Sequence, residues 1–306
     1  MIMDTSFLPN NSNPLISVII PCYNSALYVT ETLNSILAQT MNNYEIVIID
    51  DGSTDNTLSI LKQFAQQHSQ IQIKIIEQEN TNVTIARVNA IKHASGVYLF
   101  FLDSDDKIAP TYFEKAANLL NQQPELSLIY SRAQHFEANT NEIWCAKNPT
   151  VLDILQIHCM GNGICMMVRK KDYDEVGGFN TDLTYGEDWE FYISMLKKNK
   201  KFYQIDEILY FYRKRNTKNS ICDSVDKKKI ARNFLKIYTK HIDFYEENNM
   251  YFHNLFDAFH QQNWQQQNLE FFNHKKKYYS NPLRKWFYKT FKSKKYEELR
   301  KKYDIN

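Results

Sequence analysis

The segment Tyr44-Glu-Ile-Val-Ile-Ile49, followed directly by Asp50-Asp-Gly-Ser-Thr-Asp55, decides the fold of this 306-residue chain. An apolar, β-branched run that ends in a polar turn is typical of a buried strand from which the chain leaves the sheet. The residues Thr54-Asp-Asn-Thr57 offer caps to a helix that carries apolar residues at helical spacing. We therefore predict a strand, a polar turn and a helix in this order.

The same pattern recurs on both sides of this segment. Ile16–Ile20 is a second apolar run, which ends at a proline and precedes helical spacing over Val29–Gln39. Further along, strand patterns at Ile71–Ile76 and Val97–Leu102 enclose a helical pattern at Val83–His93. Four strands that alternate with three helices predict an α/β fold with a doubly wound, mainly parallel sheet flanked by helices.

The composition excludes several classes of protein. With 43% hydrophobic and 24% charged residues and only 7 Gly and 7 Pro, the chain is neither disordered nor fibrous. Its five cysteines form no C-x-x-C pair, which argues against a disulfide framework or a zinc site. The first 14 residues lack the features of a signal peptide, and no run reaches the roughly 18 apolar residues that a membrane span needs. We expect a cytoplasmic location.

Polar clusters follow three of the predicted strands. They are Pro21-Cys-Tyr-Asn24, Asp50–Asp55 and Asp103-Ser-Asp-Asp106. In doubly wound sheets, ligands bind beyond the carboxyl ends of the strands, where such loops converge. The chain has neither a G-x-G-x-x-G nor a P-loop motif, so the sequence supports neither a classical dinucleotide site nor a P-loop phosphate site.

The segment Asp103-Ser104-Asp105 has two interpretations. Clustered carboxylates repel one another unless they share a cation, and oxygen ligands select a hard ion such as Mg²⁺ or Mn²⁺. The alternative is a solvated acidic turn that caps the next helix. The Asp50–Asp55 segment is likewise either a strand-to-helix turn built around Gly52 or an acceptor of hydrogen bonds from a nucleoside.

A third acidic segment, Gly186-Glu-Asp-Trp-Glu-Phe191, stands at the start of a predicted helix. Acidic residues there are ordinarily favourable partners of the helix dipole. The functional interpretation is that one carboxylate reaches into the cleft as a general base. The sequence alone leaves both interpretations open.

Four segments, in this order along the chain, resemble the family-2 glycosyltransferases, nucleotide-sugar enzymes of the GT-A fold. They are Ile16–Asn24, Asp50–Asp55, Leu102–Asp106, and Val176-Gly-Gly-Phe179 followed by Gly186–Phe191. The resemblance covers about two-thirds of the chain and fades after Tyr212. It departs from the family pattern at Asn80-Thr-Asn82, where many relatives carry Asn-Gly-Gly, and at Arg213-Lys-Arg215, where a histidine is common. These three basic residues either grip a diphosphate or form a solvent-facing turn.

The resemblance implies roles for individual residues, each at the position that matches the family motif. The residues that it assigns to the nucleotide-sugar site are Pro21, Tyr23, Asn24, Asp51, Arg87, Asp103, Ser104 and Asp105. Within this set, Asp51 matches the residue that binds uracil. The resemblance implies that Asp105 is the principal ligand of a Mn²⁺ or Mg²⁺ ion, with Asp103 as a second ligand nearer the ribose. Asp188 matches the catalytic base.

The implied activity is an inverting, metal-dependent transfer of a hexosyl or N-acetylhexosaminyl group from a nucleotide diphosphate donor, most simply a UDP-sugar. The acceptor would be a hydroxyl of a surface glycan, such as lipopolysaccharide or capsule, or of a lipid-linked oligosaccharide. Two alternatives remain: a non-catalytic nucleotide- or glycan-binding scaffold of the same fold, and a sugar nucleotidyltransferase. The sequence identifies neither the sugar, the linkage nor the oligomeric state.

The domain organisation follows from the shift in composition near Asp223. We expect an N-terminal tail (1–15), a GT-A catalytic domain (16–222, with a nucleotide-binding half to residue 106 and an acceptor half from 107) and a helical, basic C-terminal region (223–306).

Residues 275–306 hold 12 Lys and Arg against 3 Asp and Glu. A basic amphipathic helix over 283–303 would either contact anionic lipid on the inner face of the membrane or dock on the catalytic domain. No nucleic-acid-binding module accompanies the charge, so we expect no nucleic-acid partner.

Overall fold

A computed structural model describes residues 14–138, 143–144, 149–156, 165–215 and 226–251. Within these residues, nine strands form one sheet with the order β3-β2-β1-β4-β8-β6-β9-β5, and β7 pairs with β6. The chain divides into two compact units, residues 1–248 and 249–306. The predicted helix at 283–303 lies outside the described residues, so its membrane contact stays a prediction.

The strands are β1 (Ile16–Cys22), β2 (Tyr44–Asp51), β3 (Ile73–Gln78), β4 (Tyr98–Phe101), β5 (Lys107–Ile108), β6 (Leu126–Glu137), β7 (Ile143–Trp144), β8 (Met166–Arg169) and β9 (Lys201–Lys214). The helices are α1 (Val29–Leu37), α2 (Thr57–Gln67), α3 (Val83–Ile91), α4 (Tyr112–Gln122), α5 (Val151–Leu155), α6 (Lys170–Glu175), α7 (Glu187–Lys197), α9 (Lys227–Lys240) and α10 (Ile242–Glu247).

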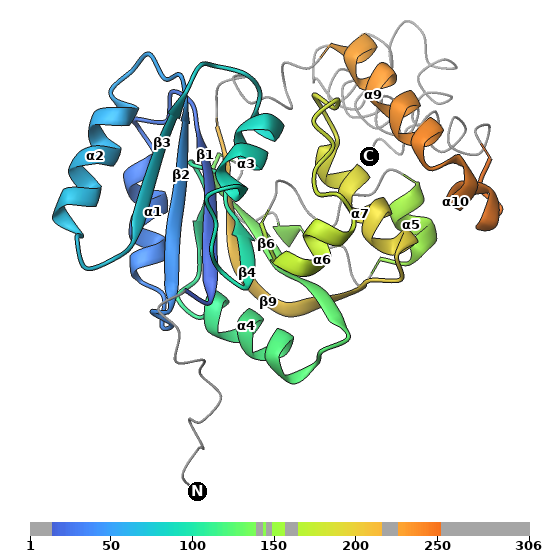
Figure 1. The fold of residues 1–306 in the computed structure, drawn as a ribbon, viewed down its shortest axis with the longest axis horizontal. Helices are drawn as coiled ribbons and strands as arrows, with labels where there is room; N and C mark the ends of the chain where they lie inside the picture. The colour runs from blue at the N-terminus through green and yellow to red at the C-terminus, as the bar shows by residue number, and fades with distance from the viewer. Residues whose placement is uncertain (1–13, 139–142, 145–148, 157–164, 216–225, 252–306) are drawn as a thin grey trace, which may run out of the picture. The chain divides into compact units, whose positions relative to one another are not determined.

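The first half of the sheet is the parallel, doubly wound unit that the sequence predicts. β2 pairs in parallel with both β1 and β3, and β1 pairs in parallel with β4. Every residue of β1 and β2 is buried, which explains their continuous apolar pattern. Figure 1 shows α1 and α2 on one face of this half and α3 on the other. This follows from right-handed crossovers, because the chain moves from β1 to β3 in one direction across the sheet and then returns past β1 to β4.

The second half of the sheet is mixed. β8 runs antiparallel to both β4 and β6, whereas β6 and β9 are long parallel neighbours. The core between the sheet and α4 contains edge-to-face aromatic pairs, with ring centroids 5.0 Å apart for Phe100 and Tyr112 and 4.8 Å apart for Phe100 and Phe113. This core holds β4 in place, and β4 leads directly into the Asp103–Asp106 segment.

A buried carboxylate fastens the amino ends of the strands. Glu45 is fully buried, and its Oε1 accepts hydrogen bonds from Ser17 Oγ at 2.6 Å, Ser95 N at 2.6 Å and Ser95 Oγ at 2.7 Å. Its Oε2 pairs with Lys74 Nζ at 2.7 Å. Burial raises the pKa of Glu45, but Lys74 and the serine donors offset this, and the net shift is downward.

We expect Glu45→Gln to lower the free energy of unfolding by about 2 kcal/mol at neutral pH, because charged hydrogen bonds are lost inside the protein. Since the folded-state pKa of Glu45 lies below its usual value of 4.5, its carboxylate stabilises the fold above that pH. This contribution disappears as the pH falls through the folded-state pKa, so the gap between variant and wild type should close in acid. Urea unfolding at neutral and acidic pH measures both effects.

The matched control is Glu77→Gln. Glu77 pairs with Lys62 at 2.7 Å, but the two side chains are 54% and 53% exposed, so its loss should cost less than about 1 kcal/mol. Equal losses in the two variants would show that Glu45 does not stabilise the fold in this way.

Candidate active site

The loop after β1 and the turn after β2 are joined at the carboxyl edge of the sheet. Asn24 Oδ1 accepts hydrogen bonds from Thr54 N at 2.8 Å and Asp55 N at 3.4 Å, while Asn24 N donates to Ser53 Oγ at 3.0 Å. Asn24 has a φ of 48°, in the left-handed region that asparagine tolerates. The predicted site residue Asn24 therefore shapes the loop with its amide.

Asp51 joins the β2 turn to the loop before α3. Its buried Oδ1 accepts hydrogen bonds from Gln78 Nε2 at 2.5 Å and from Thr81 N and Oγ1, both at 3.0 Å. Gly52, at φ +73°, leaves no space for a side chain, because a Cβ would lie 2.8 Å from Asn80 N. The Asn80–Asn82 loop, which departs from the family pattern, thus packs directly against the turn.

Asp50 is the neighbouring carboxylate at the end of β2. It is 3% exposed, and its Oδ2 accepts a hydrogen bond from Ser53 N at 3.3 Å. Its Oδ1 is buried without a hydrogen-bond donor among the described residues. This oxygen is an acceptor whose hydrogen-bonding capacity is unused among the described residues.

Ser104 links the Asp103–Asp106 segment to the loop after β1. Its hydroxyl is 2.6 Å from that of Ser25, and both residues are buried. Cys22 also lies buried beside this link, and burial, together with the charge of Asp50, raises the pKa of its thiol. Pro21 is buried at the end of β1, paired with Ile49, whereas Tyr23 is 51% exposed at the mouth of the site.

The guanidinium of Arg87 bridges two carboxylates from different parts of the chain. It donates to Asp103 Oδ1 at 2.6 Å and to Glu187 Oε1 at 2.8 Å, and Arg87 is only 3% exposed. Burial lowers the pKa of Arg87, but the two carboxylates raise it more. Arg87 was predicted to bind the donor, and that role stays a prediction. In this structure its two terminal nitrogens pair with carboxylates, so it positions Asp103 and Glu187.

Asp188 stands at the beginning of α7, next to Glu187. Gly186 precedes the helix with φ 76°, and Asp188 Oδ1 accepts a hydrogen bond from Trp189 N at 2.8 Å. Asp188 is partly exposed, whereas Trp189 is buried, donates from Nε1 to Ile154 O at 2.5 Å and packs against Phe234 at 5.0 Å between ring centroids. The helix start therefore holds Asp188 at the surface while its neighbours anchor α7.

Helix α9 completes the support of α7. Asn233 Oδ1 accepts a hydrogen bond from Thr184 N at 3.1 Å, and the fully buried Glu190 pairs with His241 Nε2 at 2.6 Å and Lys240 Nζ at 2.7 Å. The sequence predicted a helical C-terminal region from residue 223, and α9 is a helix at the start of that region. Its packing on α7 had no signal in the local sequence pattern.

Asp105 and Asp106 each pair with groups on β9 or just beyond it. Asp105 Oδ2 forms an ion pair with Arg215, and Asp106 accepts hydrogen bonds from Arg213 N at 2.8 Å and from the Tyr210 hydroxyl. Burial, and then the charges of neighbouring aspartates, raise the pKa of both carboxyls. Asp106 is 1% exposed, so it fastens the acidic segment to β9.

Arg213 is buried rather than part of a solvent-facing turn. It is 6% exposed and donates to Glu137 Oε1 at 2.5 Å, to Glu31 and, from Nε, to Asp105 O at 2.6 Å. The sequence could not reveal this, because Glu31 and Glu137 are 182 and 76 residues away along the chain.

Asp103 and Asp105 offer two carboxylates that suit a hard divalent ion. Among the residues that the structure describes, no group of three or more His, Cys, Asp or Glu side chains is arranged to hold a metal. A bound ion would thus need oxygen ligands from a substrate or from water. Asp103 and Asp105 therefore suit an ion whose remaining ligands come from a substrate or from water, but they do not form a complete coordination shell by themselves.

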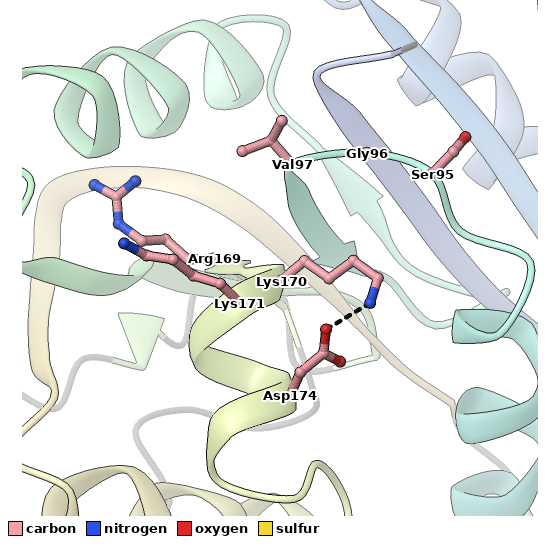
Figure 2. Close-up of a pocket in the computed structure, with 7 residues that line it drawn as sticks. All are labelled: Ser95, Gly96, Val97, Arg169, Lys170, Lys171 and Asp174. Atoms are coloured by element: carbon pink, nitrogen blue, oxygen red, sulfur yellow. Dashed lines mark hydrogen bonds and ion pairs between the residues drawn. The ribbon is translucent and has the colours of Figure 1, made fainter.

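A separate cavity of about 330 Å³ lies away from these residues. Ser95, Gly96, Val97, Arg169, Lys170, Lys171 and Asp174 line it (Figure 2). It adjoins the amino end of β4, whereas Asp103 follows the carboxyl end. Lys170 pairs with Asp174 at 2.7 Å, and Arg169 donates from Nε to Leu126 O at 2.7 Å. Ligands of parallel sheets bind at the opposite edge, so this cavity is not the candidate site.

Comparison with known proteins identifies the family. A model described as "Glycosyl transferase family 2" matches residues 17–177. The candidate teichuronic acid biosynthesis glycosyltransferase TuaG of Bacillus subtilis is 32% identical over 235 residues, which cover 74% of this chain and 88% of TuaG. The minor teichoic acid biosynthesis protein GgaB of the same species is 29% identical over 67% of this chain, but the match spans only 23% of GgaB.

Solved structures share the fold. S. aureus TarS (residues 1–349) in complex with UDP-GlcNAc has a TM-score of 0.57 at 20% identity, covering 75% of this chain and 73% of that one. The mannosyltransferase PcManGT from Pyrobaculum calidifontis, in complex with GDP-Man and Mn²⁺, has a TM-score of 0.56 at 20% identity, covering 76% and 65%. At these identities the likeness shows the fold alone. Together with the family match, it confirms the resemblance and the GT-A architecture.

No helix among the described residues is both long enough and apolar enough to cross a membrane. The peripheral membrane contact and the cytoplasmic location stay predictions.

We expect Arg87→Gln to lower the free energy of unfolding by about 3 kcal/mol, because it leaves Glu187 buried without its cation. Arg132→Gln is the matched control, since Arg132 pairs with Asp206 at 3.3 Å with side chains 32% and 82% exposed, and its loss should cost about 1 kcal/mol or less. Urea unfolding of both variants measures the difference. Equal costs would refute the bridging role of Arg87.

Proposed function

The chain belongs to glycosyl transferase family 2, and on this basis we propose that it transfers a sugar from a nucleotide diphosphate donor, most simply a UDP-sugar, to an acceptor hydroxyl with inversion at the anomeric carbon. The observation that carries the proposal is the bridge from Asp103 through Arg87 to Glu187. This bridge ties the acidic segment after β4 to the helix that begins beside Asp188.

In this proposal the donor binds in the half formed by residues 16–106. Asp50 and Asp51 lie at the carboxyl end of β2 as hydrogen-bond acceptors for a base, and the exposed ring of Tyr23 offers an apolar surface beside them. The complexes of TarS with UDP-GlcNAc and of PcManGT with GDP-Man support a nucleotide-sugar donor.

Asp103 and Asp105 would hold a Mn²⁺ or Mg²⁺ ion together with the donor diphosphate. When bound, such an ion neutralises the negative charge that develops on the leaving diphosphate. The Mn²⁺ in the PcManGT complex supports this choice of ion. The structure's own contribution is a pair of carboxylates fixed by Arg87 and by the ties of Ser104 and Asp106 to neighbouring elements.

Asp188 is the proposed general base in the half formed by residues 107–222. Its carboxylate accepts the proton of the acceptor hydroxyl while that oxygen forms the new bond to the anomeric carbon. The bond to the donor diphosphate breaks on the opposite face, which inverts the configuration and needs no covalent enzyme intermediate. The buried side chains of Glu187, Trp189 and Glu190 anchor the first turn of α7, from which Asp188 projects.

The proposed acceptor is a cell-surface polysaccharide or its lipid-linked precursor. The names of TuaG and GgaB, which refer to teichuronic and teichoic acid biosynthesis, support this class. The enzyme would work in the cytoplasm at the inner face of the membrane, with the predicted basic helix at 283–303 toward anionic lipid.

We expect Asp188→Asn to reduce kcat by about 100-fold or more and to leave donor binding unchanged, because only the proton acceptor is removed. Turnover with a UDP-sugar and calorimetry with UDP separate the two effects. Asp182→Asn, an exposed aspartate of the preceding loop, is the control and should keep full turnover. Full turnover of the Asp188 variant would refute the assignment of the base.

Metal dependence is tested by calorimetry of the full chain with UDP, in Mn²⁺ and after EDTA. We expect UDP binding to weaken at least about tenfold after EDTA and in Asp105→Asn. EDTA removes the ion that pairs with the diphosphate, and the substitution removes the principal protein ligand of that ion. Asp206→Asn, whose side chain is 82% exposed in its pair with Arg132, is the matched control. UDP binding that is indifferent to metal and to Asp105 would contradict the proposed ion site.

A further inference from the structure

Arg215 lies against the carboxylate that is the principal predicted metal ligand. Its guanidinium forms an ion pair with Asp105 Oδ2, and its central carbon lies 4.5 Å from the centroid of the Tyr28 ring. The side chains of Arg215 and Asp105 are 27% and 25% exposed, respectively. The pair thus sits at the edge of the site, supported by an aromatic ring of the loop after β1.

The neighbouring arginine is unavailable for such a role. Arg213 is held by Glu31 and Glu137, and its side chain is only 3% exposed. Arg87 is likewise buried between Asp103 and Glu187. Of these three arginines, Arg215 alone has a single carboxylate partner among the described residues and a partly exposed side chain, so it is the one that could change partner at little cost in stability.

The carboxylate of Asp105 needs a positive charge nearby. Its side chain is 25% exposed, so it is only partly in contact with water, and the charge of Asp103 lies close to it. A divalent ion would supply the same compensation, but an arginine and a metal ion on one carboxylate repel each other. Guanidinium groups also match the paired oxygens of a phosphate, with two parallel hydrogen bonds.

We propose that Arg215 is the counter-cation of Asp105 in the metal-free protein, and that it moves from Asp105 to the donor diphosphate when a divalent ion binds. This inference rests on the proposed function, because it assumes an ion site at Asp105. The Tyr28 ring supports the guanidinium through a cation–π contact, which does not require Asp105.

The exchange links the two ligands of the site. Without nucleotide, the ion must displace Arg215 before it can reach Asp105, so metal binding is weakened. With nucleotide, the released guanidinium gains a new anionic partner, so the ion and the diphosphate favour each other's binding. Free metal would therefore bind poorly until a donor arrives.

The test measures binding of Mn²⁺ alone and of UDP in saturating Mn²⁺, using the full chain. Electron paramagnetic resonance of free Mn²⁺ reports the first, and calorimetry reports the second. We expect Arg215→Gln to bind Mn²⁺ alone about threefold to tenfold more tightly, because a partly exposed ion pair no longer competes. We expect the same variant to bind UDP about tenfold more weakly, since a charged hydrogen bond to phosphate is lost.

Lys214→Gln is the matched control, because it removes the same charge one residue away without an ion pair to Asp105. Lys214 Nζ lies 5.7 Å from the centroid of the Tyr212 ring. Both affinities of this variant should stay within about twofold of wild type. Arg215→Ala repeats the measurement with a smaller side chain, and an unchanged melting temperature verifies the fold of each variant.

The outcomes separate this inference from the proposed function. Wild type that binds neither Mn²⁺ nor UDP overturns the proposed function, and this inference with it. Wild type that binds both, with unchanged or weaker Mn²⁺ binding in Arg215→Gln, overturns the exchange alone. Equal changes in Lys214→Gln would show that general charge, and not the contact with Asp105, is responsible, and would also overturn it.

Discussion

The rest of the site depends on one buried guanidinium. Arg87 comes from α3, yet it neutralises Asp103 after β4 and Glu187 at the start of α7. Because an unpaired charge in the interior would cost several kcal/mol, the buried Arg87 and Glu187 stabilise each other in the folded protein, and Arg87 also holds the partly exposed Asp103. This requirement fixes the acidic segment relative to Asp188, which belongs to a different half of the predicted catalytic domain.

Around this bridge, the structure balances its carboxylates with arginines that differ in burial and in number of partners. Arg87 and Arg213 are buried and held by two carboxylates each, so they determine geometry. Arg215 is partly exposed and has one carboxylate partner among the described residues, so it is suited to exchange. The same residue type thus serves as a fixed support or as a movable charge, according to its burial and the number of its partners.

The sequence predicted the parallel half of the sheet well. The strands at 16–22, 44–51 and 98–101 are buried on both faces, which leaves an unbroken apolar run that sequence periodicity detects. The second half was harder to predict, because β6 and β9 are separated by more than sixty residues and their parallel pairing carries no local signal. The support of α7 by α9, through Asn233 and His241, escaped prediction for the same reason.

By itself, the sequence determined that Asp-rich turns follow β2 and β4 and that a polar loop follows β1. Strand ends and turns can be recognised in this way because they depend on residues close together in the sequence. It also determined the family, through four motifs in order. Only the tertiary structure decided which charges meet. It paired Arg87 with Asp103 and Glu187, buried Arg213 and brought Arg215 to Asp105. The physical reason is that ion pairing depends on distance and burial in the folded chain, and these arise from contacts between residues far apart in sequence.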